Sequence, residues 1–466
     1  MKQKSKGKRA EHKFLFLFIF AFLCFWGCSD NNSSDAYDPG KPIQIVSFSP
    51  ESGSARTQIL IRGENFGSDA SRIKVEIGGI SARVIGVNNG IIYCMVPPLA
   101  YDGVIEVTIE DTEGKAQTVV ADKTFEYIRK SMVTTIAGYV SETGEYKVED
   151  GPFDNAGFGS IVWMSVDPQN SNHIYMIEER ASIRLLDLVN EEVSTVISIG
   201  QMNITNPRTI SWTPEGDMVL SNDQPNADGI SSVRLKREDG FMRAEVMTNT
   251  QSCNGMDIHP VTGEYYLTQW NGSVVYRFDP ASDEKPAPIF SLSTGSFSTF
   301  VVFHPEGRYA YFIAEDMNYI MKSIYNWEQR TLGVPSIFVG SPHGAGDWLD
   351  GAGTSARFYY PHQGIFAKND AYVEAGLTDV YDFYVCDRWG NCIRKITPEG
   401  IVTTLAGRGS PGLDDRAFGY VDGDLRKEAR FREPYGIVFK EDEAKFFVSD
   451  KENHRIRGII IEEGTK

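Results

Sequence analysis

One stretch decides the fold of most of this chain: Tyr384-Val385-Cys386-Asp387-Arg388-Trp389-Gly390-Asn391-Cys392-Ile393-Arg394-Lys395-Ile396. An apolar run ends in Asp387, a turn with Gly and Asn follows, and a second extended run begins at Ile393. The same design returns at Phe447-Val448-Ser449-Asp450-Lys451-Glu452-Asn453-His454-Arg455-Ile456-Arg457. Short apolar runs separated by turn residues predict β-hairpins. We therefore interpret both stretches as copies of one repeated hairpin.

The residue that closes the second strand of this hairpin recurs along the chain. We place it at Glu178, Asp223, Gln269, Glu315, Asp387 and Asp450. The first four positions are 45, 46 and 46 residues apart, which is typical of one four-stranded propeller blade. The later intervals are 72 and 63 residues, and the excess falls in Gly-rich insertions near 340–356 and 408–425. Six such positions predict six blades.

A second motif precedes three of the predicted first strands. It reads Asp150-Gly151…Ala156-Gly157-Phe158, Asp350-Gly351…Ala356-Arg357-Phe358 and Asp422-Gly423…Ala429-Arg430-Phe431. Together with the hairpin, it resembles NHL repeats, most closely in the first, fifth and sixth units. The resemblance covers residues 131–466 and implies an all-β, six-bladed NHL-type propeller.

The chain itself indicates how the ring closes. The fifth unit ends in Ile401-Val402-Thr403-Thr404-Leu405-Ala406-Gly407, and nearly the same string, Met132-Val133-Thr134-Thr135-Ile136-Ala137-Gly138, stands before the first unit. The sixth unit stops after its third strand, at Ile459-Ile460-Ile461. Residues 132–137 are therefore predicted to be the missing outer strand of the sixth blade, which removes two open sheet edges.

Residues 42–129 form a separate β segment. About seven short runs separated by Gly, Pro and Ser turns predict an immunoglobulin-like sandwich. The pattern SFSPESGS…ILIRGENFG…VPP resembles an IPT/TIG domain over the whole segment. Such domains are usually spacers or interaction modules in exported bacterial proteins, and no catalytic constellation occurs here.

The N-terminus indicates export. Residues 1–28 contain a cationic segment, an apolar run from Phe14 to Trp26, and Gly27-Cys28. This pattern predicts a secretory signal, and its end resembles a bacterial lipobox with Cys28 as the lipidated residue. The acidic residues that follow resemble the signal that sends Bacteroidetes lipoproteins to the cell surface. We expect an outer-membrane lipoprotein exposed at the cell surface, with the periplasmic face as the alternative, and a flexible tether at 29–41.

One face of a propeller collects the loops that lead into the first strands and the tips of the hairpins. The candidate ligand-binding residues there are Arg208, Asn254, Trp270, Phe297, His362, Arg388, Trp389 and Tyr435. Sugars stack their apolar faces on aromatic rings and need oriented donors and acceptors for their hydroxyls. Tip carboxylates also cap turns, so we expect a structural role for Asp387 and Asp450. Packing between blades is the alternative role for Trp270 and Trp389.

Few features favour catalysis. Of the seven His residues, only His362 is expected near the channel, whereas a catalytic zinc site needs three protein ligands. The sequence has no nucleophile elbow, phosphate loop or HExxH motif. We therefore expect no enzyme activity, no catalytic residues and no cofactor. A structural calcium ion stays open, because Asp414-Asp415 and Asp422-Gly423-Asp424 form acidic loops, although without EF-hand spacing.

The formal net charge of −17 argues against binding nucleic acid or an anionic membrane. Membrane contact is expected only through the lipid anchor, and the protein is expected to be a monomer. The state of Cys386 and Cys392 stays open. These residues flank the hairpin turn, and either a disulfide or two buried thiols fit their spacing.

This layout is similar to accessory components of glycan-uptake systems in gut Bacteroidetes. The resemblance implies a non-catalytic cell-surface protein that binds glycan. One alternative is a protein-interaction scaffold on the cell envelope, which is a common use of NHL propellers. The other is a lyase or lactonase-like enzyme that uses the propeller channel.

Overall fold

The computed structural model describes residues 36–55, 57–97, 99–226, 229–282, 285–342 and 346–462. The chain divides into two compact units, Met1–Glu126 and Tyr127–Lys466. The predicted signal segment with Cys28, and the first part of the predicted tether, lie outside the described residues. Among the helices that are described, none has the length and apolar character needed to cross a bilayer.

The first unit is an antiparallel β domain whose main sheet runs in the order β1-β3-β6-β5-β4-β7-β8. Its strands are β1 (Gln44–Ser49), β3 (Gln58–Glu64), β4 (Ile73–Ile77), β5 (Ile80–Asn88), β6 (Ile91–Met95), β7 (Ile105–Glu110) and β8 (Ala116–Val120), with the short β2 (Ser52–Gly53) and η1 (Ala70–Arg72) in loops. Alternate residues of β7, Ile105, Val107 and Ile109, are buried, as expected for a sheet with one face in a core.

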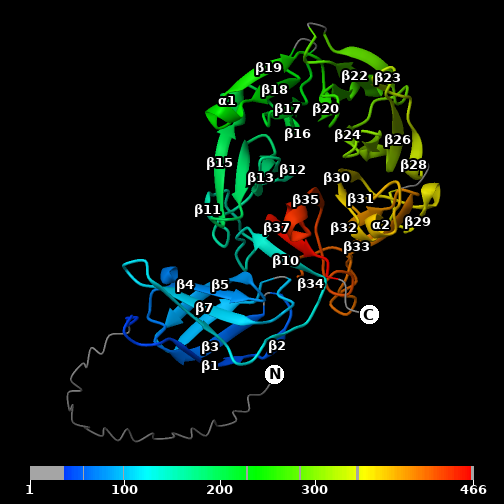
Figure 1. Ribbon diagram of the computed structural model, residues 1–466. Helices are drawn as coiled ribbons and strands as arrows, with labels where there is room; N and C mark the ends of the chain where they lie inside the picture. Colours follow the sequence, from blue (N-terminus) through cyan, green and yellow to red (C-terminus); the bar gives the residue numbers. More distant parts are fainter. Residues whose placement is uncertain are drawn as a thin grey trace, which may run out of the picture. The chain divides into compact units, whose positions relative to one another are not determined.

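The second unit is a propeller, and Figure 1 shows its sheets arranged around a centre. Within the described residues, six antiparallel sheets follow one another around the ring. The innermost strands are β12 (Ile161–Asp167), β16 (Pro207–Trp212), β20 (Cys253–Ile258), β24 (Thr299–Phe303), β30 (Pro361–Lys368) and β35 (Pro434–Lys440). They define blades one to six.

The outer strands of each blade follow in chain order. The second strands are β13 (Asn170–Glu178), β17 (Met218–Asn222), β21 (Tyr265–Gln269), β25 (Tyr309–Ala314), β31 (Tyr381–Asp387) and β36 (Lys445–Asp450). The third strands are β14 (Ser182–Asp187), β18 (Ser232–Leu235), β22 (Val274–Phe278), β26 (Tyr319–Asn326), β32 (Cys392–Ile396) and β37 (Arg455–Ile460). The fourth strands of blades one to five are β15 (Glu192–Ser198), β19 (Ala244–Thr248), β23 (Ala287–Ser291), β28 (Ser336–Gly340) and β33 (Ile401–Gly407).

Short elements complete the blades. The two-residue strands β11 (Gly151–Pro152), β29 (Gly351–Ala352) and β34 (Gly423–Asp424) add a fifth strand to blades one, five and six, and β27 (Thr331–Leu332) pairs with β26. Two single-turn helices lie in connections, α1 (Ile199–Met202) after blade one and α2 (Asp370–Glu374) within blade five. The strand β9 (Glu126–Tyr127) stands where the two units join in the sequence.

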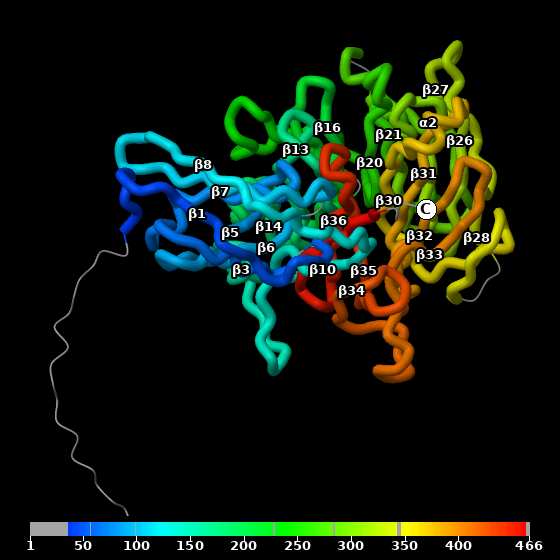
Figure 2. The backbone as a smooth tube through the Cα atoms, turned by 60° about the horizontal axis from the view of Figure 1, so that its bottom comes forward, coloured from blue at the N-terminus to red at the C-terminus, as the bar shows by residue number. Residues whose placement is uncertain are grey.

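Blade six combines the two ends of the second unit. The strand β10 (Met132–Ala137) pairs antiparallel with β37, with Met132 opposite Ile460 and Val133 opposite Ile459. Figures 1 and 2 show β10 beside the C-terminal strands. The side chains of Val133 and Ile459 are both buried. The ring is therefore closed by hydrogen bonds and apolar packing between its first and last strands.

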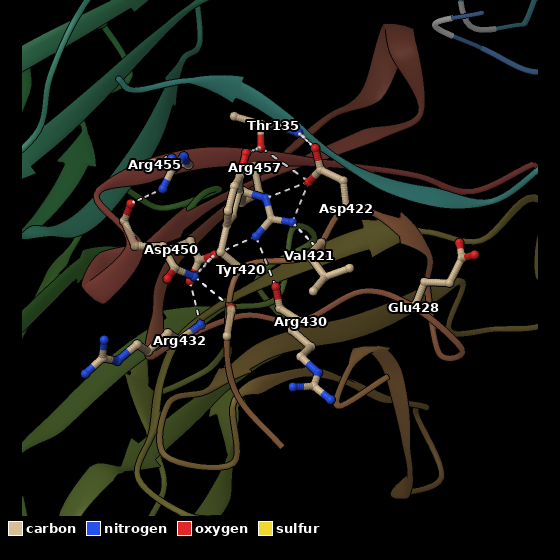
Figure 3. Close-up of polar contacts among 12 residues, drawn as sticks. Thr135, Tyr420, Val421, Asp422, Glu428, Arg430, Arg432, Asp450, Arg455 and Arg457 are labelled. Atoms are coloured by element: carbon tan, nitrogen blue, oxygen red, sulfur yellow. Dashed lines mark hydrogen bonds and ion pairs between the residues drawn. The ribbon is translucent and has the colours of Figure 1, made fainter. Parts of the chain in front are cut away.

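Buried arginines explain the repeat motif. In blade six the guanidinium of Arg457 donates to Asp450 at 2.6 Å and to Asp422, and also to the backbone carbonyls of Val421 and Arg430. Figure 3 shows this arrangement. Asp450, Asp422 and Arg430 belong to the two motifs that define the repeat, and Val421 directly precedes one of them. These contacts explain the motifs, because a buried guanidinium needs several acceptors.

The same arrangement occurs in the other two complete copies. In blade five, Arg394 donates to Asp387 and Asp350, both at 2.9 Å. In blade one, Arg184 contacts Glu178 at 3.3 Å and Asp150 at 2.8 Å. The acidic residue that ends the second strand of each of these blades also accepts a backbone N–H from the residue that follows the Phe of the second motif. Asp387, for example, accepts the N–H of Tyr359, which follows Phe358, at 2.7 Å. Asp387 and Asp450 are thus enclosed by the protein, with no exposed surface.

Candidate functional site

The first strands carry the candidate residues at irregularities in their pairing. In blades two, three, five and six the register shifts by one residue directly after the first strand residue. Arg208, Asn254, His362 and Tyr435 lie in these bulges, at equivalent positions of their blades. Bulges re-aim side chains and are common beside binding sites. These four residues therefore form part of one ring at one mouth of the channel.

A buried carboxylate, Glu315, gathers residues from several blades. Its Oε1 lies 3.3 Å from Nη1 of Arg388 and 3.9 Å from Nε2 of His362. Its Oε2 lies 4.0 Å from Nη2 of Arg208. Arg388 also donates through Nε to Glu433 at 3.1 Å. We call Arg208, Glu315, His362, Arg388, Glu433 and Tyr435 the mouth cluster.

Aromatic rings surround these charges. The ring of Tyr435 lies 4.1 Å from that of His362, and the Arg388 guanidinium lies 4.4 Å above the Tyr435 ring. The guanidinium of Arg208 lies 5.6 Å from the ring of Phe300. Cation–π contacts at these distances stabilise the arginines while leaving some of their N–H groups for other partners.

Burial shifts the protonation equilibria of the mouth cluster. Burial raises the pKa of Glu315 to about 7, although Arg208 and Arg388 favour its ionised form. Burial, with the positive charges of Arg208 and Arg388, holds the pKa of His362 well below its usual range. The imidazole is therefore neutral at pH 7, and the carboxyl group can both donate and accept hydrogen bonds near that pH.

Trp389 extends the mouth cluster towards solvent. It follows Arg388 in the hairpin tip of blade five, and 36% of its surface is exposed. Its indole ring lies 3.9 Å from the ring of Tyr360 and 5.1 Å from that of Tyr359. The guanidinium of Arg388 lies 5.4 Å from the indole. An exposed aromatic surface thus stands directly beside arginine and carboxylate groups, a combination suited to a ligand with hydroxyls and apolar faces.

The other predicted residues lie outside this contact network. Trp270 is 43% exposed at the hairpin tip of blade three, where its backbone bonds to Ser252. Asn254 is buried, and its Oδ1 has no hydrogen-bond partner among the described residues. The prediction placed both on the channel face with Arg388, and no hydrogen bond, ion pair or ring contact of the described residues joins either of them to the mouth cluster.

Phe297 has a different role from the one expected. Its side chain is 2% exposed and belongs to the core between blades three and four. The backbone N–H of the next residue, Ser298, donates to Asp316 at 2.9 Å. Phe297 is therefore a core residue instead of a surface contact.

Glu315 is the functional residue that the sequence reasoning did not select. It directly follows β25, at the position that Arg388 holds after β31, since the N–H of each donates to the residue before the first strand, Ser298 and Tyr360 respectively. The strand pairing puts Ala314 and Met321 where blade five has Asp387 and Arg394. Glu315 thus has no motif arginine in its own blade, and its carboxylate contacts arginines of other blades. An acidic residue directly after a second strand, in a blade without the motif arginine, was a usable signal.

The two cysteines of the central hairpin are free thiols. Cys386 stands opposite Ile393, and Cys392 stands opposite Asp387. Because neighbouring residues of a strand point to opposite faces, the two sulfur atoms lie on different sides of the sheet. The register therefore decides against the disulfide that the spacing left open.

No group of three or more His, Cys, Asp and Glu side chains in the described ranges is arranged to hold a metal ion. The imidazole of His362 has Glu315 as its one acidic neighbour at ion-pair distance among those residues. The mouth cluster therefore offers hydrogen-bond donors, acceptors and rings, and it offers fewer ligands than a zinc site requires.

Comparisons with known proteins agree with this architecture. The sequence pattern of the IPT/TIG domain family matches residues 42–127. The chain is similar to the crystal structure of an auxiliary nutrient binding protein from Bacteroides thetaiotaomicron VPI-5482, with 44% identity and a TM-score of 0.69, over 92% of this chain and 100% of that one. No curated protein matches.

Two further solved structures are similar over the same length. An auxiliary nutrient binding protein from Bacteroides ovatus ATCC 8483 is 34% identical, with a TM-score of 0.69, over 92% of this chain and 100% of that one. A Bacteroides thetaiotaomicron protein with a provisional phosphatase name is also 34% identical, with a TM-score of 0.69, over 92% of this chain and 99% of that one.

Proposed function

Because this chain belongs to the family of the Bacteroides auxiliary nutrient binding proteins, we propose that it is a non-catalytic accessory protein that binds a nutrient glycan at the cell surface. The observation that carries the glycan assignment is the position of Trp389. Its exposed indole stands beside Arg388, whose guanidinium contacts both Glu315 and Glu433.

The mouth cluster fits the chemistry of a sugar. A pyranose ring has an apolar face that stacks on an indole, and hydroxyls that need donors and acceptors at fixed directions. Trp389 and Tyr360 offer the stacking surface. Arg208 has one distant acidic partner, Glu315 at 4.0 Å, so it retains N–H groups for sugar hydroxyls. The largely neutral imidazole of His362 adds no charge that would select an ion.

Attachment at the outer membrane rests on the N-terminal pattern. In this proposal Cys28 carries the lipid, the segment 29–41 acts as a tether, and the IPT/TIG domain serves as a spacer. The signal is tested by Cys28→Ala, which should release the protein from the membrane fraction and remove lipid from the N-terminal peptide in mass spectrometry. Protease treatment of intact cells then separates surface exposure from the periplasmic alternative, because only a surface protein is cleaved.

The binding proposal is tested by a glycan array and affinity gels with the purified protein. We expect Trp389→Ala and Arg388→Ala each to weaken glycan binding about tenfold or more, since an aromatic contact and a charge-assisted hydrogen bond each contribute on the order of 1–3 kcal/mol. Trp270→Ala tests whether blade three takes part. Trp327→Ala is the matched control, because its indole is 50% exposed and packs on His259, remote in sequence from the mouth cluster.

Several results would overturn this proposal. Absence of binding to every glycan, with one envelope protein captured specifically through the same face, would establish the scaffold alternative. Turnover of a phosphate ester, lactone or glycan that is lost in Glu315→Gln would establish an enzyme. Equal loss of binding in Trp389→Ala and Trp327→Ala would place the ligand elsewhere.

A further inference from the structure

The opposite mouth of the channel holds a cavity. Its volume is about 520 Å³, and all six innermost strands contribute to its wall. One residue from each blade illustrates this: Met164, Ser211, Asp257, Val302, Ile365 and Phe439. The exposed turn residues Pro168, Pro214 and Pro260 form its rim. These turns follow the ends of the first strands, whereas the mouth cluster stands at their beginnings.

A side-chain amide stands between the cavity and the mouth cluster. Gln363 accepts the backbone N–H groups of Met164 at 2.9 Å and Ile437 at 3.3 Å, and it donates to the carbonyl of Met164 at 2.7 Å. These bonds tie blades one, five and six together across the channel. No residue of the mouth cluster lines the cavity, so the cavity and the mouth cluster have different chemistry.

The cavity wall carries a single acidic side chain and no Lys or Arg. That acid is Asp257, which is half-buried and accepts hydrogen bonds from Ser211 at 3.2 Å and from the Phe303 N–H at 2.9 Å. None of the ion pairs of the described residues includes it. Burial raises the pKa of Asp257 to about 6, so the group is mainly ionised at pH 7.5 without a positive partner.

The one imidazole of the wall adds no positive charge. His259 accepts the N–H of Thr262 at its Nδ1, at 3.1 Å, and its Nε2 lies 3.0 Å from the carbonyl of Gly307. This pattern fits a neutral ring that donates through Nε2, and burial lowers the pKa of His259. The electrostatic field in the cavity is therefore set by the Asp257 carboxylate.

Most of the remaining wall is apolar. Blades one to three contribute Ser165 and Ser211 and also Met164, Ile210 and Met256, and blades four to six contribute Gln363 and also Val302, Ile365 and Phe439. The half-buried indole of Trp212 also lines the space, and its Nε1–H is already donated to Ser165 at 2.8 Å. The Arg237 guanidinium already lies 5.6 Å from the Trp212 ring, and the rings of Tyr175 and Phe241 pack on it, so Trp212 contributes apolar surface to the wall.

We propose that this cavity binds a small organic ammonium ion, with the cationic group beside Asp257 and the carbon skeleton against Ile365 and Phe439. A carboxylate without a positive partner among the described residues favours a positive charge, and the apolar wall favours an organic cation over a hydrated metal ion. A cavity of this size accommodates a molecule of about ten non-hydrogen atoms with room for water.

The test uses choline and its neutral isostere 3,3-dimethyl-1-butanol, titrated into the purified protein at pH 7.5 by calorimetry or ligand-observed NMR. We expect choline to bind at least about tenfold more tightly than the isostere, and Asp257→Asn to abolish that difference. Ile365→Lys should also abolish it without touching the hydrogen bonds of Asp257. D-glucosamine against N-acetylglucosamine tests whether a sugar amine is preferred.

Two controls make the result decisive. Arg388→Ala, in the mouth cluster, should leave choline binding unchanged, and a thermal unfolding curve verifies that each variant is folded. The proposal is overturned if both members of each pair bind equally, if neither ammonium compound binds at tens of millimolar, or if folded Ile365→Lys binds choline as the parent does.

Discussion

Arg388 and Glu315 form an ion pair of 3.3 Å between the hairpin tips of blades five and four. The same guanidinium contacts Glu433 of blade six at 3.1 Å, so one arginine links three blades at the mouth of the channel. Glu315 nevertheless has a pKa raised to about 7, because burial opposes its ionisation more strongly than Arg208 and Arg388 favour it. This balance makes the mouth cluster sensitive to pH.

Glu315→Gln is expected to change how stability depends on pH. The folded pKa of Glu315 lies above its ordinary value of 4.5, so the folded state binds the proton more tightly than the unfolded state. The parent protein should therefore lose stability relative to Glu315→Gln as the pH rises from about 4.5 to about 7, at a rate of up to about 1.4 kcal/mol per pH unit.

Urea unfolding of both proteins across this pH range measures the effect. The difference between the two unfolding free energies should level off above pH 8. A constant difference at every pH would show that the carboxyl group has an ordinary pKa in the folded protein. Asp316→Asn, next in the sequence, is the control for loss of a nearby acid.

Arg394→Met should destabilise the propeller by about 3–5 kcal/mol, because it leaves the enclosed Asp387 carboxylate without its cation. Adding Asp387→Asn should restore part of the lost unfolding free energy, since it removes the buried carboxylate that has no cationic partner in Arg394→Met. The unfolding free energy of the two single variants and the double variant checks this. Arg416→Met, whose side chain is 64% exposed, should leave stability nearly unchanged.

Val133→Ala should lower stability by about 2 kcal/mol, because Val133 is buried in the strand that closes blade six and truncation leaves a cavity there. Val46→Ala is the matched control, since that side chain is 70% exposed in the first unit and should change stability by less than about 0.5 kcal/mol. Equal effects of the two substitutions would mean that the closing strand contributes little to the propeller core.

The four described cysteines should react with a thiol reagent only after unfolding. All four are buried, and burial raises the pKa of the Cys94 thiol to about 12, so the reactive thiolate is scarce in the native protein. A reducing agent should leave the thermal unfolding curve unchanged. A mass two hydrogen atoms lower for the peptide containing Cys386 and Cys392 would contradict this, because it would require a disulfide between opposite faces of the sheet.

Much of the propeller could be predicted from local chemistry. The acidic, Arg and Phe residues of the motif recur in blades one, five and six because each of these blades buries one guanidinium among equivalent acceptors, as Arg394 and Arg457 show. The closing strand could be located because its sequence repeats that of the fourth strand of blade five. The structure gives the reason: Thr135 and Thr404 make equivalent hydrogen bonds, to Asp422 and Asp350 respectively. Where a blade has lost this motif, as blade four has, position in the sequence no longer indicated which face a side chain occupies.

The candidate site was only partly predictable. Arg208, His362, Arg388 and Tyr435 were expected near the channel and lie together in the mouth cluster, whereas Phe297 lies in the core. Glu315 and Glu433 join the cluster because residues far apart in the sequence meet there.

The sequence alone determined the repeat, because blades one, five and six each satisfy a buried arginine with acceptors that lie nearby in the sequence, as Arg394 does with Asp350 and Asp387. Only the tertiary structure decided which side chains share the channel. That outcome depends on the bulge that re-aims Arg208 and His362, on the cross-strand register that separates Cys386 from Cys392, and on burial that raises the pKa of Glu315. Each of these arises from contacts between strands and between blades, which form only when the chain folds and cannot be predicted from the local sequence.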